Sequence, residues 1–197
     1  MARIEPLTIR EWPPEMRAAL AAMTPPAPRH PSLPVENRPK AMNTLGIFAR
    51  HTELAHAFFT FNGHIIRATT LTERQRELLV LRVASLRGCT YEWSQHVLIA
   101  ADTGLTDEEI RRVADDPTSA EWSALEGAML RAADELVADG VIADGTWAQL
   151  AADLDPQQLL DLIFTIGAYE TLAYMMRSFD LALDDDLVEA LAEHGDG

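Results

Sequence analysis

The chain has very little cysteine, because Cys89 is the only one among 197 residues. A single cysteine cannot form a disulfide within the chain, which is typical of proteins of the reducing cytoplasm. No uncharged apolar run approaches the roughly 18 residues of a membrane-spanning helix. The N-terminus lacks the basic start and apolar stretch of a secretory signal peptide. We therefore expect a cytoplasmic protein with no membrane partner.

Positive charge is also scarce. The chain has 16 basic and 31 acidic residues, which gives a formal net charge of −15. Residues 1–100 carry 12 basic and 8 acidic side chains, a net +4, whereas residues 101–197 carry 4 and 23, a net −19. An acidic surface repels phosphate backbones and anionic lipid. The charge therefore excludes nucleic acid as an expected partner.

Proline is almost missing beyond the first part of the chain, since nine of the eleven prolines lie in residues 1–39. Proline is excluded from helix interiors and from central strands. We therefore predict an extended Pro-rich N-terminal arm over residues 1–39. The arm is expected to wrap either a neighbouring subunit or the flank of its own helical domain, residues 40–197.

Residues that typically begin or end helices recur along the rest of the chain. Thr72 and Gln75 form a capping box that predicts a helix over Glu73–Arg87, ending at Gly88. No segment shows the alternation of a half-buried strand. The sequence predicts an all-α fold with seven to nine helices. The others are expected over 39–50, 53–67, 91–103, from Thr106, from Thr118 to Gly140, over 146–153 and 156–183, and after Asp184.

Two of the expected helices are apolar over most of their circumference, the one over 78–86 and the one over 159–174. Such helices are buried in a core or between subunits. A monomer of this size has room for about one of them. We therefore expect a homo-oligomer.

The residues that carry chemistry lie between Glu77 and His96. Glu92 and His96 are four residues apart and share a helix face, so a carboxylate can orient an imidazole that titrates near neutral pH. Cys89 lies at the positive end of the same helix, where a thiolate is favoured. Glu77 lies on the preceding apolar helix, where burial would raise its pKa.

Each of these residues also has a purely structural interpretation. Glu92 can cap its own helix, and Glu77 can form a surface ion pair with Arg74 or Arg82. A lone cysteine is most often a small buried hydrophobe, which applies to Cys89. The aromatic residues Tyr91 and Trp93 can belong to the core.

No metal site is expected. His51, His56 and His64 are five and eight residues apart, so their three rings do not share one helix face. The run Asp184–Asp186 is interpreted as a helix cap with a solvated face.

The segment from Glu77 to His96 resembles the active-site helix pair of the AhpD-like, carboxymuconolactone decarboxylase family. Members of that family carry a Glu, then twelve residues on a Cys-x-x-Cys, then a His four residues after the second Cys. Glu77, Cys89 and His96 fall at these spacings, and Glu92 takes the place of the second cysteine. The resemblance implies an AhpD-like helical bundle that assembles as a trimer or hexamer.

The substitution of the second cysteine implies a branch without peroxidase activity. Family peroxidases oxidise and re-reduce their cysteine pair, and this cycle cannot close in a chain with Cys89 alone. The decarboxylase branch has a Glu four residues before a His, and uses neither a metal nor an organic cofactor.

The resemblance therefore implies a cofactor-free acid/base enzyme acting on a small carboxylated or enolisable organic molecule. His96 would be the general acid/base, Glu92 its orienting partner and Glu77 a second proton carrier. Cys89, Tyr91 and Trp93 would line the pocket. Two alternatives stay open: a thiol oxidoreductase in which Cys89 works with an external thiol, and a non-catalytic helical oligomer that binds a ligand or a partner protein.

Overall fold

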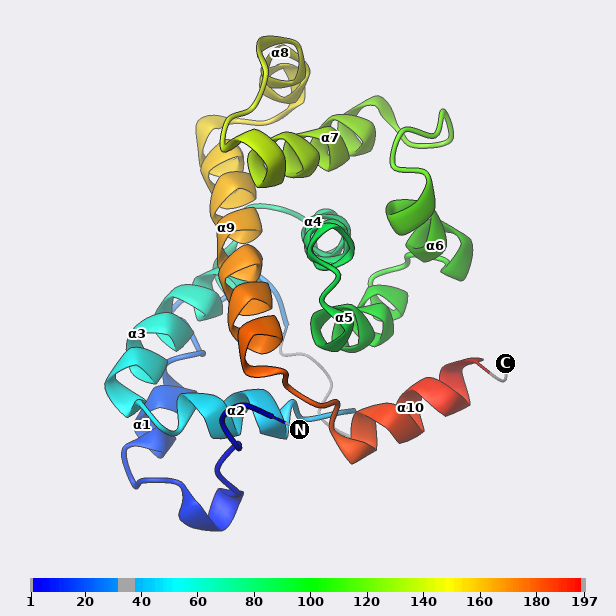
Figure 1. Ribbon diagram of the computed structural model, residues 1–197. Coiled ribbons are helices and arrows are strands. Elements are labelled where there is room, and N and C mark those ends of the chain that lie inside the picture. The colour runs from blue at the N-terminus through cyan, green and yellow to red at the C-terminus, as the bar shows by residue number, and fades with distance from the viewer. Residues whose placement is uncertain (1, 32–37, 196–197) are drawn as a thin grey trace. The chain divides into compact units, whose positions relative to one another are not determined.

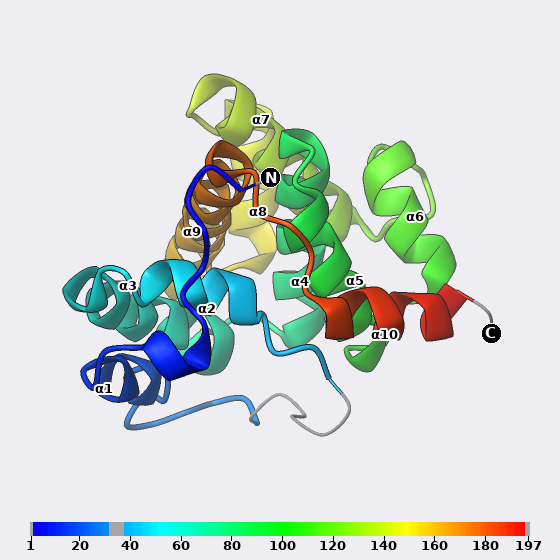
Figure 2. The ribbon, with the colours of Figure 1, turned by 60° about the horizontal axis from the view of Figure 1, so that its bottom comes forward.

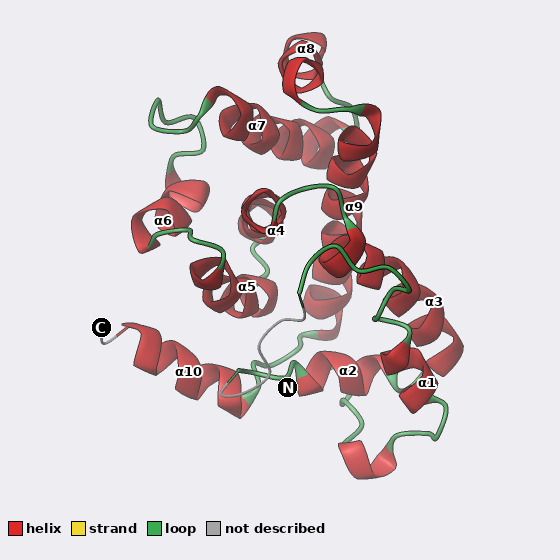
Figure 3. Cartoon of the chain, turned by 180° about the vertical axis from the view of Figure 1, so that it is seen from behind, coloured by secondary structure: helices red, strands yellow, loops and turns green. Residues whose placement is uncertain are grey.

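The structure is a computed structural model that describes residues 2–31 and 38–195. Every regular element in these residues is helical, so the fold is all-α as predicted (Figure 3). Packing divides the chain into two compact units. One comprises residues 70–174, and the other residues 1–69 together with 175–197.

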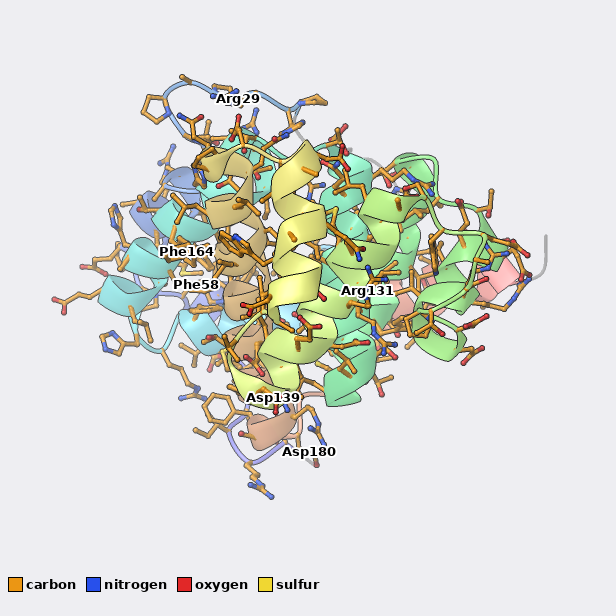
Figure 4. The ribbon with its side chains drawn as sticks, turned by 90° about the horizontal axis from the view of Figure 1, so that it is seen from above. Arg29, Phe58, Arg131, Asp139, Phe164 and Asp180 are labelled. Carbon is orange, nitrogen blue, oxygen red and sulfur yellow. The ribbon has the colours of Figure 1, made fainter. Side chains whose placement is uncertain are left out.

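The unit of residues 70–174 is built around helix α4 (Glu73–Arg87). Figure 1 views α4 nearly along its axis, with other helices of the unit around it. Every residue from Arg76 to Ala84 is buried. This confirms the prediction of a helix enclosed on all sides. The helices around α4 are α5 (Thr90–Asp102), α6 (Asp107–Asp115), α7 (Ala124–Asp139) and α9 (Pro156–Phe179), and α8 (Asp144–Asp153) packs on the outer side of α7 (Figure 1 and Figure 4).

Local signals set both ends of α4. The Thr72 side chain accepts a hydrogen bond from the Gln75 backbone N–H, and the Gln75 side chain accepts one from the Thr72 N–H. At the other end Gly88 has φ +56°, a left-handed conformation that costs glycine nothing. The turn at Gly88 sends the chain directly into α5, so the two helices pack side by side (Figure 2).

Helix α7 begins later than predicted. The expected start at Thr118 is wrong, because the capping box that forms is Ser123 with Glu126. Both sites carry the same Ser/Thr-x-x-Glu pattern. Trp122 decides between them: it is buried in the core, its Nε1–H donates to the Asp116 carbonyl, and the Arg112 guanidinium lies over its ring. This anchoring holds the residues before Ser123 in an irregular loop.

Helix α9 combines a polar anchor with a long apolar body. Asp155 accepts hydrogen bonds from the backbone N–H groups of Gln157 and Gln158, which caps the helix start. Asp161 accepts from the Thr70 N–H and hydroxyl, which ties α9 to the segment before α4. By length and mean hydropathy α9 resembles a membrane span, but 56% of its most apolar window is buried inside the protein. This degree of burial is that of a core helix.

The second unit contains α1 (Met16–Ala21), α2 (Met42–Phe48), α3 (Thr52–Gly63) with a π-helical turn over His64–Ala68, and α10 (Asp185–Gly195) (Figure 2). Helix α3 is capped by the His51 side chain, which accepts from the Leu54 N–H, so the helix begins one residue before the predicted range 53–67. The buried side chains of Met16 and Ala19 on α1 belong to this unit's core.

The N-terminal arm is not extended throughout. Besides α1 it contains a 3₁₀ turn over Ile9–Glu11. The prolines permit both elements because they lie at the starts or outside them, as Pro13 and Pro14 lie just before α1. The arm approaches α2 closely at Gly46, where an added β-carbon would overlap the Leu7 carbonyl oxygen. Residues 32–37 of the predicted arm lie outside the described residues.

Candidate active site

Helices α4 and α5 bring Glu77 and His96 together. The turn at Gly88 places α5 beside α4, so the two side chains meet although they are 19 residues apart. The distance from His96 Nδ1 to Glu77 Oε2 is 2.7 Å. Glu77 is buried and the His96 side chain is 12% exposed. The Glu77 side chain therefore reaches His96 from the preceding helix.

Arg76 completes this contact from the other side. Its Nε donates to Glu77 Oε1 at 2.9 Å, and both side chains are 1% exposed. Burial by itself would raise the pKa of Glu77, but the charges and hydrogen bonds of His96 and Arg76 outweigh it. The pKa of Glu77 therefore lies below its ordinary value, in contrast to the raised pKa predicted from burial. Glu77 is an ionised carboxylate.

The charge on Glu77 determines the tautomer of His96. An ionised carboxylate can only accept hydrogen bonds, so Nδ1 must carry the proton. In the neutral ring Nε2 is then the atom with a free lone pair. This is the arrangement that a histidine base requires.

Tyr169 of α9 fixes the plane of the His96 ring. The two rings meet edge to face, with centroids 5.0 Å apart and an interplanar angle of 87°. Burial, and then the nearby charge of Glu77, raise the pKa of Tyr169, so its hydroxyl is neutral. Tyr169 is not among the site residues that the sequence predicts. Asp161, Thr165 and Tyr169 recur every four residues and so share one face of α9, and this polar stripe is the signal that could have found Tyr169.

Glu92 does not have its predicted role. The expectation that it orients His96 is wrong, because Glu77 holds the ring and neither Glu92 oxygen has a hydrogen-bond partner. It does not cap α5 either, although it occupies the third position of that helix. Glu92 is 1% exposed, and burial raises its pKa well above the ordinary value.

The three residues predicted to line the pocket lie close by in the chain. Cys89 and Tyr91 are buried at the start of α5. Trp93 packs against a cluster of apolar side chains from α4, α5, α6 and α7, which is the core role that the sequence also allowed. Among residues 2–31 and 38–195, no group of three or more His, Cys, Asp or Glu side chains is arranged to hold a metal ion.

Residues 52–135 match the model of the carboxymuconolactone decarboxylase family. This part of the chain is similar to that family. The match includes Arg76, Glu77, Glu92 and His96, whereas Tyr169 lies beyond it. No curated protein matches the chain in sequence.

Solved structures show how far the carboxymuconolactone decarboxylase likeness extends. The debrominase Bmp8 aligns with a TM-score of 0.75 and 18% identity over 96% of both chains, and a cysteine-to-alanine variant of it has been solved with 2,3,4-tribromopyrrole. An alkylhydroperoxidase AhpD core, a peroxidase-related protein of Ralstonia eutropha, aligns with a TM-score of 0.66 and 18% identity over 83% of this chain and 96% of its own. A peroxidase-related protein of Silicibacter aligns with a TM-score of 0.67 and 16% identity over 74% of this chain and 78% of its own. The fold is therefore AhpD-like.

Proposed function

We propose that this protein is a cofactor-free acid/base enzyme acting on a small carboxylated or enolisable organic molecule. The observation that supports the proposal most is the 2.7 Å contact between His96 Nδ1 and a buried, ionised Glu77. In this pair Nε2 of His96 is the basic nitrogen, and the Glu77 carboxylate places a negative charge next to the opposite ring nitrogen, Nδ1. Proton transfer by such a pair needs no metal and no organic cofactor.

In the proposed mechanism Nε2 of His96 takes a proton from an acidic C–H group of the substrate. The imidazolium that forms is stabilised by the Glu77 carboxylate, which keeps its negative charge because Arg76 holds its other oxygen. The proton is then returned to the product from the same nitrogen. Glu77 and Arg76 are positioning residues in this scheme, and His96 is the residue that contacts the substrate.

The thiol oxidoreductase alternative has less support. Cys89 is the only cysteine of the chain and is 2% exposed. Glu92 occupies the position of the second cysteine that the family peroxidases use, and a carboxyl group cannot form the disulfide of their cycle.

A cytoplasmic homo-oligomer, either a trimer or a hexamer, is part of the proposal. The single cysteine supports the reducing compartment. The exposed face of α9 supports assembly, because Leu160, Phe164 and Tyr174 are each at least half exposed on one long helix. Exposed apolar side chains of this size, gathered on one element, are typical of subunit contacts.

The function is tested by solvent deuterium exchange. The protein is incubated in D₂O with small lactones, ketones and carboxylic acids, and deuterium entering their carbon positions is measured by NMR. We expect exchange with wild-type protein and a loss of about 10²–10⁴-fold in His96→Ala. Cys89→Ala is the matched control and is expected to exchange at the wild-type rate.

Two results would count against the proposal. Exchange at an unchanged rate in His96→Ala would remove the proposed base. Exchange of none of these compounds by the wild-type protein would favour the non-catalytic helical oligomer.

A further inference from the structure

Glu92 is a buried polar group that the fold does not use. It is 1% exposed, and both of its carboxyl oxygens lack a hydrogen-bond partner. Buried polar atoms are nearly always hydrogen-bonded, because an unmet hydrogen bond costs about 1–3 kcal/mol. Residues 2–31 and 38–195 therefore contain no hydrogen-bond partner for the Glu92 carboxyl group, and we infer that it has one outside them.

The surroundings of Glu92 keep it uncharged. Burial is the sole cause of its raised pKa, so no nearby cation opposes that effect. Arg76, the one cation of the cluster formed by Arg76, Glu77, Glu92, His96 and Tyr169, is paired with Glu77. The positive end of α5 favours a negative charge there, but no backbone N–H of that end binds a Glu92 oxygen. A carboxyl group that is this buried and has no ion-pair or hydrogen-bond partner favours its protonated form, which has an O–H group to donate.

Glu92 and the proposed base share one neighbourhood. His96 lies one turn further along α5, and its ring meets Tyr169 edge to face. Tyr169 lies near both Glu77 and Glu92, since both carboxyl groups influence the pKa of its hydroxyl. A hydrogen-bond donor, Glu92, and a proton acceptor, His96 Nε2, therefore lie around the same aromatic side chain.

We propose that Glu92 donates a hydrogen bond to the carbonyl oxygen of a neutral enolisable substrate, a lactone or a ketone, while His96 removes the proton beside that carbonyl. This inference rests on the proposed function and narrows its substrate class. It assigns Glu92 a catalytic role that differs from the orienting role expected from its spacing to His96.

The proposed step is a proton transfer without oxidation or loss of a group. The C–H bond beside the carbonyl breaks, and its proton moves to Nε2 of His96. The electron pair left behind forms a C=C bond, and the carbonyl π pair moves onto the oxygen. Glu92 stabilises that oxygen through its O–H and keeps its own proton. In an unsaturated lactone His96 then returns the proton to the far end of the conjugated system, which shifts the double bond.

The charges of the cluster favour a neutral substrate over a carboxylated one. A substrate carboxylate would approach the ionised Glu77 in surroundings that largely exclude water. The cluster has a single cation, Arg76, and Glu77 already engages it. The free energy needed to desolvate a second anion in such a site would exceed the electrostatic attraction that the site offers it.

The test uses α-angelica lactone, a neutral lactone whose double bond shifts when the proton beside its carbonyl is removed. Its analogue carrying a carboxymethyl group in place of the methyl group is the charged comparison. Isomerisation is followed by NMR and ultraviolet absorbance. We expect a higher kcat/KM for the neutral lactone.

Three variants separate the roles of the side chains. Glu92→Met removes the donor at similar volume, and we expect kcat to fall about 10²–10³-fold, the range seen when a donor to a developing oxyanion is lost. Glu92→Gln keeps an N–H donor and is expected to retain activity within about tenfold of wild type. Asp139→Asn, an exposed carboxyl at the end of α7, is the control and is expected to behave as wild type.

Failure of this inference differs from failure of the proposed function. If His96→Ala abolishes isomerisation but Glu92→Met does not, His96 is a base and Glu92 is not its partner. A preference for the carboxylated lactone, or no reaction with either lactone, would overturn the neutral substrate class. Infrared difference spectra of wild type and Glu92→Gln give a readout without substrate. The C=O stretching band of a protonated carboxylic acid should be present only in wild type, and its absence there would overturn Glu92 as donor.

Discussion

Replacing Glu92 by glutamine should remove a pH-dependent loss of stability. Glutamine has nearly the same shape as a protonated glutamate, but it cannot ionise. Burial raises the pKa of Glu92 well above its ordinary value in the folded protein, whereas the unfolded chain exposes the group with a pKa of about 4.3. Between these two pKa values the folded state holds a proton that the unfolded state has released.

The sign of the effect follows from this difference in bound protons. When the folded state binds more protons than the unfolded state, the free energy of unfolding falls as pH rises. One group contributes about 1.4 kcal/mol per pH unit within that window. The wild-type protein should therefore lose stability relative to Glu92→Gln by about this slope from about pH 5 upward, until the folded-state pKa is reached.

Groups with a lowered pKa do not interfere in this range. Hydrogen bonding by Arg74 lowers the pKa of Glu109 to about 2, and His96 and Arg76 lower that of Glu77. Their contributions to stability are complete above the unfolded pKa and are lost only as pH falls below about 4. The other titrating groups, the six histidines included, are present in both proteins, so the difference in unfolding free energy between wild type and Glu92→Gln above pH 5 is assigned to Glu92.

The assay is urea unfolding of wild type and Glu92→Gln at half-unit steps between pH 5 and pH 8, with the free energy of unfolding taken from each curve. The exposed Asp139, labelled in Figure 4, supplies the control Asp139→Asn, whose difference from wild type should stay constant. A Glu92→Gln difference that is equally constant would refute the reasoning, because it would mean that Glu92 has the same pKa in the folded and unfolded states.

Three further predictions concern the ion pair, the thiol and the assembly. Glu77→Leu should destabilise the protein by about 3–5 kcal/mol in urea unfolding, because the buried Arg76 loses the opposite charge of Glu77, and Arg76→Leu/Glu77→Leu together should recover much of this loss. Organic hydroperoxides with a dithiol reductant should not be turned over, and peroxide consumption that disappears in Cys89→Ser would contradict this. Light scattering should give a mass well above the 21.8 kDa of one chain, and Phe164→Asp on the exposed face of α9 should lower it.

The helices that the sequence predicts best are those whose ends depend on neighbouring residues alone. The capping boxes at Thr72 and Thr106 and the left-handed Gly88 act over three or four residues, and the helices begin or end where these residues indicate. The start of α7 is different, because two equivalent capping boxes compete and the buried Trp122 decides between them. That decision depends on tertiary packing, which a local pattern does not contain.

The helix within the N-terminal arm is missed because the prediction uses the composition of the whole segment. Its proline count is a property of the whole segment, whereas α1 occupies the stretch between Pro14 and Pro25, which has no proline. Composition predicts what a segment cannot form as a whole. It does not show where a short proline-free stretch becomes helical.

The spacing of Glu77, Glu92 and His96 in the sequence locates the site, but it does not show which of these side chains contact each other. The rule that residues four apart on a helix are neighbours pairs Glu92 with His96. The contact that forms instead links His96 to Glu77, 19 residues away, once α5 folds back beside α4. Long-range pairs of this kind depend on how two helices are oriented, and the periodicity of either helix alone does not contain that orientation.

Arg76 decides which of the two glutamates carries the charge. A buried carboxylate stays ionised only if a cation or several hydrogen bonds compensate for lost water. Arg76 binds Glu77 and nothing comparable binds Glu92, so Glu77 becomes the anion that supports His96 and Glu92 becomes an acid. If this reasoning is correct, Arg76→Leu alone should favour a protonated Glu77 and thereby weaken the base. The expected result is a fall in kcat with the lactone substrate and an acid limb of the pH–rate profile displaced to higher pH, whereas an arginine with only a structural role would leave that profile in place.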